Sequence, residues 1–288
     1  MVITNKLELP QAVVDLVKDN EGHELNWDRY SVTELLDSTR EIILNRRYGD
    51  VIEQDVSQMT NLILGSAVHN LIEKYDKTNM AEYKLEYKVD SKTLVGRIDL
   101  YDEVNHTIVD WKTATVMKVL KKDFSDYDKQ GLMYSWLAIK NCLYVGKYKF
   151  ILFLKDWTAR ELRLAKLKGD FYPESAIYVY EVNITADLLN ATEDKIKAKI
   201  SELELAEQLA DDELPDCEET WYTGDKWAVY KNLTDVRAQR VFDTEKEAND
   251  YVAAKGGKVV FRQGQHRKCQ DYCSCCEYCK YYKERKAE

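Results

Sequence analysis

The chain lacks the marks of a secreted, membrane-spanning or DNA-coating protein. Its 288 residues include 51 Asp and Glu against 42 Lys and Arg, a formal net charge of −9. This balance argues against passive coating of a polyanion, although it permits a local basic groove around a bound cation. No segment approaches the ~20 consecutive apolar residues of a membrane helix, and the opening MVITNKLELP lacks the basic and apolar regions of a secretory signal. We therefore expect a soluble, cytoplasmic protein.

Cysteine is absent before Cys142 and concentrated near the C-terminus. Of seven cysteines, five lie between Cys269 and Cys279. In a cytoplasmic protein this is not a disulfide framework, and the dense spacing indicates metal binding. Four thiolates suit either zinc or an iron–sulfur cluster, so the residues alone leave the metal open.

Hydrophobic periodicity predicts an α/β core. A capping box formed by Ser31 and Glu34 is expected to begin a helix that reaches Arg47. The expected helix at residues 58–75 has an apolar stripe that should be buried: Leu64, Val68, Leu71, Ile72 and Tyr75. Other helices are expected at residues 11–20, 125–140 and 185–209, and strands at residues 83–89, 93–101, 107–112, 147–154 and 176–182.

After residue 220 the sequence pattern changes to that of short strands around one helix. Strands are expected at residues 226–230 and 237–242, then a helix at 245–254 and a strand at 258–262, forming a small ββαβ insertion. The predicted organisation is an N-terminal helical region at 1–57, a core at 58–215, the ββαβ insertion at 216–264 and a cysteine-rich segment with a charged tail at 265–288. No internal repeat is visible.

Residues 96–112, GRIDLYDEVNHTIVDWK, carry the most informative pattern. They are typical of two strands joined by a polar turn. Asp110 and Lys112 are two residues apart, so their side chains share a face, while Trp111 points to the opposite layer. Asp99 on the neighbouring strand can lie beside them. Burying two acids and a lysine for stability alone is unfavourable, so this pattern indicates a metal site with a cationic helper.

These residue types suit hydrolysis of a phosphodiester. Asp99 and Asp110 can share Mg²⁺ or Mn²⁺, with the backbone carbonyl of Trp111 as a further ligand, and such an ion generates a nucleophilic water at neutral pH. Lys112 would orient that water or neutralise the scissile phosphate. Taken alone, however, a D-x-K pattern is more often an ion pair on a surface strand.

Polar residues on two helices extend this pattern. Gln130 and Tyr134 are four residues apart and share one face of the expected helix at 125–140. They can hydrogen-bond phosphate or sugar and stack on a base, and Gly131 allows close approach. Upstream, His69 follows Gly65 by four residues, a placement that by itself more often marks a surface histidine.

Four motifs thus follow one another at plausible spacings: Gly65-x3-His69, Gly96-x2-Asp99, Asp110-x-Lys112 and Gln130-x3-Tyr134. In this order the sequence resembles the RecB-like branch of the PD-(D/E)XK nuclease superfamily, most closely the RecB-like exonucleases of phages and CRISPR systems. The resemblance covers most of the chain. It implies a restriction-endonuclease-like α/β core, with a central mixed sheet flanked by helices, in the cytoplasm of a bacterium or phage-infected cell.

The resemblance also implies roles for the motif residues. His69, Asp99 and Asp110 would be metal ligands and Lys112 the catalytic lysine, while the glutamine and tyrosine of the last motif would position DNA. The implied activity is metal-dependent exonucleolytic cleavage of single-stranded DNA or DNA ends, alongside other recombination or DNA-processing proteins. Alternatives are a structure-specific or nicking endonuclease on the same core, and a catalytically silent DNA-binding recombination accessory protein. The oligomeric state stays open.

Several such nucleases carry a [4Fe–4S] cluster, and Cys269, Cys273 and Cys279 resemble their C-terminal cysteine triplet. The chain departs from the CRISPR-type pattern because it has no N-terminal cysteine. Cys217 resembles the position used in phage-type relatives and is the preferred fourth ligand. Cys276 is the alternative fourth ligand, and Zn²⁺ is the alternative metal.

Further charged residues are candidates of lower rank. Glu73 and Glu86 lie near the motif residues and are additional candidate ligands. Basic residues that can line a DNA path are Arg40, Arg46, Arg47, Lys118, Lys121 and Lys122. A solvated loop is nearly as good an interpretation of residues 118–122.

Overall fold

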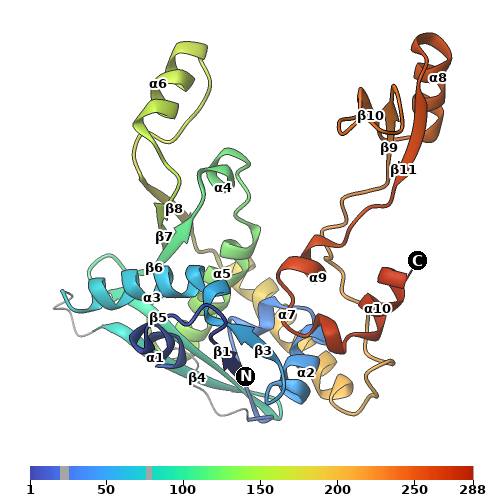
Figure 1. Cartoon of the computed structure of the whole chain (residues 1–288). Helices are drawn as coiled ribbons and strands as arrows, with labels where there is room; N and C mark the ends of the chain where they lie inside the picture. The colour runs from blue at the N-terminus through green and yellow to red at the C-terminus, as the bar shows by residue number, and fades with distance from the viewer. Residues whose placement is uncertain (20–25, 76–79, 288) are drawn as a thin grey trace. The chain divides into compact units, whose positions relative to one another are not determined.

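The computed structural model describes residues 1–19, 26–75 and 80–287, so the expected end of the first helix at Asn20 lies outside the described residues. The chain divides into two compact units, Met1–Ala210 and Asp211–Glu288 (Figure 1). In the described parts of the chain, no helix is long and apolar enough to cross a bilayer.

The first unit is built on a six-stranded mixed sheet. Its strands are β2 (Arg29–Ser31), β4 (Ala81–Val89), β5 (Lys92–Asp102), β6 (Thr107–Ala114), β7 (Lys147–Leu154) and β8 (Ile177–Asn183). The order is β2-β5-β6-β7-β8, with β4 paired to β5. The β2–β5 and β6–β7 pairs are parallel, and the β4–β5, β5–β6 and β7–β8 pairs are antiparallel. A separate pair, β1 (Val2–Thr4) and β3 (Glu53–Asp55), is parallel.

Helices flank this sheet, as the sequence led us to expect (Figure 1). The helices of the first unit are α1 (Gln11–Asp19), α2 (Thr39–Tyr48), α3 (Thr60–Glu73), α4 (Val116–Leu120), α5 (Ser125–Lys140), α6 (Ala159–Lys168), which projects away from the sheet in Figure 1, and α7 (Ala186–Ala206). Helix α5 packs against strands β4 to β7, α7 packs against α5 and α2, and α3 packs against β6. On α7, Ile196, Ile200 and Leu203 are fully buried, which is the apolar line of an amphipathic helix facing a core.

The capping box forms, but the long helix expected after it does not. The Glu34 amide donates to Ser31 Oγ at 3.1 Å, and the Ser31 amide donates to Glu34 Oε2 at 2.8 Å. These reciprocal bonds begin only a 3₁₀ turn, Glu34–Leu36, because Asp37 is extended and α2 starts afresh at Thr39. Glu34 also pairs with Arg46 at 2.7 Å, which ties this turn to α2.

The apolar stripe predicted to be buried on α3 is largely exposed. Leu64, Leu71 and Tyr75 are 42%, 60% and 71% exposed, and no residue of α3 is fully buried. The helix instead uses Ile63, which packs against a small apolar cluster containing residues of α1. The 3.6-residue period was therefore real, but a periodic stripe does not reveal whether protein or open space lies opposite it.

Glycine 96 lies where strand β5 changes neighbours along one edge. Pairing with β2 ends at Val95, and pairing with β6 begins at Leu100. Between them, a Cβ on Gly96 would lie 2.9 Å from the Tyr134 ring of α5. Gly131 of α5 is equally tight, because its Cβ would lie 2.7 Å from the Tyr148 ring. Both motif glycines therefore let α5 approach the sheet.

The second unit contains a three-stranded antiparallel sheet in the order β10-β9-β11. Its elements are β9 (Lys226–Tyr230), β10 (Arg240–Phe242), α8 (Glu245–Lys255), β11 (Lys258–Arg262), α9 (Arg267–Asp271) and α10 (Lys280–Ala287). A β-bridge joins Tyr222 to His266. Beside it, His266 Nδ1 lies 2.7 Å from Thr220 Oγ1, and the Lys268 amide donates to the Thr220 carbonyl at 3.1 Å. The two ends of the segment between these residues are thus held together.

Replacing Gly96 with alanine should destabilise the first unit. The added Cβ would meet Tyr134 and Leu137 at 2.9 and 3.0 Å, and overpacking of this kind lowers the free energy of unfolding by roughly 1–3 kcal/mol. Urea unfolding measures the change. Gly65→Ala is the matched control, because no atom lies within 4 Å of that Cβ and alanine favours a helix by about 1 kcal/mol. Equal effects of the two substitutions would contradict the packing role of Gly96.

Candidate metal centre

Asp99 binds the backbone of the neighbouring strand through its side chain. Its Oδ2 accepts a hydrogen bond from the Trp111 amide at 2.8 Å. Regular β5–β6 pairing starts one residue later, at Leu100 and Val109. The carboxylate therefore takes the place of a main-chain acceptor at the point where β5 joins β6, which brings Asp99 beside residues 110–112.

Asp110 and Lys112 form an ion pair on β6, with Lys112 Nζ 2.7 Å from Asp110 Oδ1. Asp110 is only 5% exposed, whereas Lys112 is half-buried. Burial raises the pKa of Asp110 to about 6, with the Asp99 charge acting in the same direction and Lys112 opposing both. Within the described residues, Asp110 Oδ1 has this ion pair but receives no hydrogen bond of regular geometry. A buried carboxylate with unused acceptor capacity suits a cation.

His69 reaches the same place from α3. Its Nε2 lies 2.9 Å from the Trp111 carbonyl oxygen and its Nδ1 lies 3.4 Å from Asp99 Oδ1. The hydrogen bond to Asp99 is the main reason that the pKa of His69 is raised. Two neighbouring ligands on an octahedral ion are about 3 Å apart, so His69 Nε2 and the Trp111 carbonyl have a separation that one ion can bridge.

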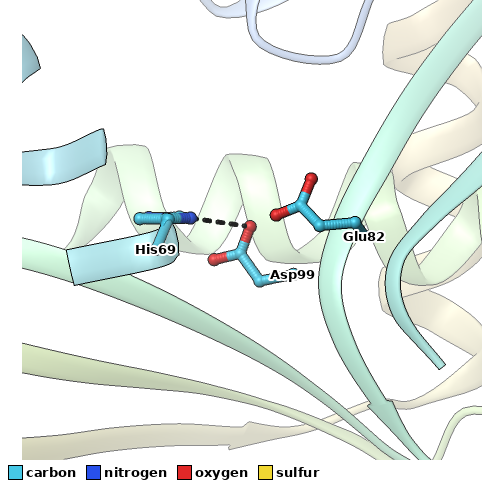
Figure 2. Close-up of side chains that lie close together, drawn as sticks. All are labelled: His69, Glu82 and Asp99. Atoms are coloured by element: carbon cyan, nitrogen blue, oxygen red, sulfur yellow. Dashed lines mark ion pairs between the residues drawn. The ribbon is translucent and has the colours of Figure 1, made fainter. Parts of the chain in front are cut away.

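Glu82 is a candidate ligand that sequence reasoning missed. One ligand atom each from His69, Glu82 and Asp99 lie within 4.8 Å of one another, and Figure 2 shows their polar groups turned toward a common space. Glu82 belongs to no recognisable motif, and the alternation of Glu82, Lys84 and Glu86 along the sequence gives no reason to prefer it. Burial raises the pKa of Glu82.

The two lower-ranked carboxylates occupy different surroundings. Glu86 is exposed and pairs with Arg29 at 2.6 Å, which accounts for it structurally. Glu73 is exposed and lines the cavity described next. Of the acidic residues on β4, it is therefore Glu82 and not Glu86 that lies at the centre.

An open cavity of about 430 Å³ borders the candidate metal centre. Asp99, Trp111 and Glu82 line it together with Leu71, Ile72, Tyr75, Ala81, Leu100, His69 and Glu73. The apolar members include Leu71 and Ile72 of α3 and Tyr75 just after it, three of the residues that were expected to be buried. The exposure of α3 therefore has a local cause, since part of its apolar face forms the wall of this cavity.

Gln130 and Tyr134 lie beneath the carboxylates. They are only 6% and 7% exposed, and burial followed by the charge of Asp110 raises the pKa of Tyr134, while a hydrogen bond with Gln130 lowers it. The expected stacking of Tyr134 on a base does not fit this burial, because only 7% of the residue is exposed. The arrangement instead places Tyr134 where it can hold the carboxylate-bearing strands in position.

Three of the six basic residues expected along a DNA path are buried or bonded to other parts of the protein. Arg40 is 4% exposed. Arg46 pairs with Glu34 and lies 3.9 Å over the Tyr30 ring, and Arg47 donates to the carbonyl oxygens of residues 206, 207 and 209. Arg40 is therefore buried, and Arg46 and Arg47 connect α2 to neighbouring segments, which does not favour a DNA path along these three arginines.

The other three basic residues follow β6. Lys118 belongs to α4, not to a loop as expected, and lies 4.5 Å from the Tyr127 ring. Lys121 and Lys122 are exposed just after this helix. They remain candidates for contact with a phosphate backbone.

No disulfide joins any of the seven cysteines within the described residues, and six of them lie in the second unit. The clamp at Tyr222 and His266 places the segment after Cys217 beside the start of α9, which contains Cys269. Cys275 was left out of the predicted ligand set, yet it is buried and its Sγ lies 3.5 Å from Cys273 Sγ. Burial and the neighbouring Cys273 raise the pKa of Cys276.

No protein-family model matches the chain, and no curated protein matches it. The chain is similar to several solved structures. One is SSO0001, with 19% identity over 66% of this chain and 83% of that chain and a TM-score of 0.47. A phage-related exonuclease from Haemophilus somnus has 16% identity over 57% and 82% and a TM-score of 0.33. LHK-Exo in complex with dAMP has 12% identity over 60% and 91% and a TM-score of 0.36.

Asp110→Asn should stabilise the metal-free protein at pH 7.5. The folded-state pKa of Asp110 is raised from 3.8 to about 6, so the folded protein binds this proton more tightly than the unfolded chain. The wild-type free energy of unfolding should therefore rise as pH falls from about 6 toward 4. Asparagine removes the buried charge, and half-buried Lys112 can turn to solvent, giving a gain of roughly 1–2 kcal/mol at pH 7.5.

Chemical denaturation in the presence of a chelator measures this gain. The difference between variant and wild type should shrink as the pH falls below 6. Asp170→Asn, which changes an exposed carboxylate, is the control and should leave stability unchanged. A less stable Asp110→Asn protein at pH 7.5 would show that the Lys112 ion pair outweighs the burial of the charge.

Proposed function

We propose that this chain is a divalent-metal-dependent nuclease that hydrolyses phosphodiester bonds in DNA. One observation carries the proposal, namely the convergence of His69, Asp99, Asp110 and Lys112 around the backbone of Trp111. An ordinary strand ion pair would need only the last two side chains. It would not need a buried carboxylate with spare acceptor capacity or a histidine held by the strand backbone.

The donor set suits Mg²⁺ or Mn²⁺. Carboxylate and carbonyl oxygens are the ligands these ions prefer, and imidazole is common with transition metals. His69, Asp99, Asp110 and the Trp111 carbonyl would hold the ion. When bound, it would polarise the phosphoryl oxygen and lower the pKa of a water molecule so that hydroxide forms near neutral pH.

The protein's own side chains would then position the attacking water and neutralise charge on the phosphate. The ammonium of Lys112 is held by Asp110 at 2.7 Å and lies 5.9 Å from the Phe150 ring, which limits its motion. From there it can orient the attacking water or neutralise charge on the phosphate. Asp99 keeps the Trp111 amide in place, so the carbonyl of the same residue is held at a defined orientation.

The substrate we propose is single-stranded DNA or DNA ends, cut exonucleolytically during recombination or DNA processing. The motif order supports this assignment. Exposed Lys121 and Lys122, which follow the catalytic strand, offer charge for a phosphate backbone. The acidic remainder of the chain would confine the DNA to this region, because net charge of −9 repels it elsewhere.

We further propose that Cys217, Cys269, Cys273 and Cys279 hold a [4Fe–4S] cluster in the second unit. The clamp between Tyr222 and His266 supports Cys217, because it returns the chain to within reach of Cys269 after the ββαβ insertion. Cys276 and the buried Cys275 are alternatives for one position. Zinc is the alternative metal.

A cleavage assay tests the nuclease proposal. Wild-type protein with Mg²⁺ or Mn²⁺ should degrade linear single-stranded DNA faster than circular DNA, and Lys112→Ala should lower the rate at least ~100-fold while the fold stays intact. Lys149→Ala is the matched control, a strand lysine 3.5 Å from Glu181, and should cut normally. Equal cutting of circles would indicate an endonuclease, and full activity of Lys112→Ala would sink the assignment.

An absorption spectrum of anaerobically purified protein tests the cluster. A [4Fe–4S] protein should be brown, with broad absorption at the blue end of the visible range, and Cys217→Ala should lose that colour. Cys142→Ala should keep it, because Cys142 is an exposed cysteine of the first unit. Colourless protein with stoichiometric zinc would point to zinc, and protein without either metal would contradict the proposal.

A further inference from the structure

We propose that Glu82 is an additional cation ligand. Asp99 would then bind a cation together with Asp110 on one side and together with Glu82 on the other. The proposal rests on the metal-dependent function above and extends the metal centre to strand β4, outside all four sequence motifs. It assigns to the His69–Glu82–Asp99 group a divalent cation such as Mn²⁺ or Mg²⁺.

The strand pairing sets two carboxylates against each other. Regular β4–β5 pairs occur at Ala81 with Leu100 and at Tyr83 with Ile98, so Glu82 and Asp99 are the residues between them. Like charges in such facing positions destabilise a sheet. Asp99 cannot turn away freely, because its Oδ2 holds the Trp111 amide at 2.8 Å. A cation between the two carboxylates would remove the repulsion.

The backbone of Glu82 is also unusual. Its φ is 52°, in the left-handed region that side chains other than glycine rarely adopt. The strand is regular at Ala81 and Tyr83, so the distortion is confined to this residue. Local strain of this kind persists where the surroundings impose it, often at binding sites, and here it accompanies a side chain that points toward His69 and Asp99 (Figure 2).

The present partner of Glu82 is one that a metal ion can displace. Arg97 Nε lies 2.7 Å from Glu82 Oε2, but the Arg97 side chain is 57% exposed, so it can turn to solvent. Ion pairs with that much exposure contribute little stability. The Arg97 guanidinium therefore shows that the space beside Glu82 favours positive charge, and it does not block a metal ion from that space.

The donor atoms match one ion in kind and nearly in distance. Ligand oxygens on a small divalent ion lie at most about 4 Å apart, and the three donor atoms are within 4.8 Å, so small side-chain shifts suffice. A third carboxylate lies nearby, because Asp110 is buried and pairs with Lys112 at 2.7 Å. Three carboxylates thus meet two permanently charged cationic side chains, Lys112 and Arg97, and His69 adds a positive charge beside Asp99 only when it is protonated.

Binding of Mn²⁺ to the full chain without DNA tests the role of Glu82, by calorimetry or by the electron paramagnetic resonance signal of free Mn²⁺. Glu82→Gln should weaken binding by roughly tenfold or more, or remove one of the bound ions. Glu86→Gln is the matched control on the same strand and should bind as wild type. Arg97→Gln should bind Mn²⁺ more tightly, because it removes the competing cation.

Two outcomes would overturn the inference. One is wild-type Mn²⁺ affinity and stoichiometry in Glu82→Gln, and the other is an equal loss in Glu86→Gln. Thermal unfolding of each variant confirms that the fold is retained, and Glu82→Asp, which keeps the charge, should bind better than Glu82→Gln. The proposed function fails separately: wild-type protein that binds Mn²⁺ yet cuts no DNA would refute the nuclease, while a cutting Glu82→Gln variant with unchanged Mn²⁺ binding would refute only Glu82.

Discussion

A charged carboxylate buried beside a lysine is the constraint on which the first unit depends. Asp110 is 5% exposed and its countercharge, Lys112, is 2.7 Å away on the same strand. Such a pair gains little net stability, because desolvation offsets the attraction. Its surroundings must therefore be rigid for other reasons. Strand β6 pairs with β7 along its whole length, and α5 packs across four strands of the sheet, so apolar packing supports a group that electrostatics alone would expose.

The break in pairing along β5 gives this constraint its geometry. Because β2 and β6 share one edge and leave residues 96–99 between them, the chain there is free to serve other purposes. Gly96 admits the Tyr134 ring, and Asp99 gives its carboxylate to the Trp111 amide. A continuous ladder would have satisfied the same amide with a main-chain carbonyl. Across the other edge, the irregularity continues at Glu82, whose backbone is left-handed.

Sequence reasoning located the elements and motif residues that local patterns encode. The bounds of α5 and β7 match the expected ones, since strong periodicity and β-branched or aromatic runs define them. Helix α6 was missed although its signals exist, a Thr158 cap and a left-handed Gly169. Glu82 could not be chosen over Glu86, because the difference arises from strand pairing. The exposure of α3 and the burial of Arg46 likewise depend on what lies opposite, which a single sequence does not state.

Because Tyr222 and His266 pair at the base of the ββαβ insertion, the distance in space between cysteines on either side of it does not follow from their separation in sequence. Tyr222 and His266 are 44 positions apart in the chain but face each other as bridge partners. The segment between them therefore begins and ends at the same place in the second unit. Its length and content can therefore drift, or be exchanged for another small module, without altering how the thiols on either side are presented.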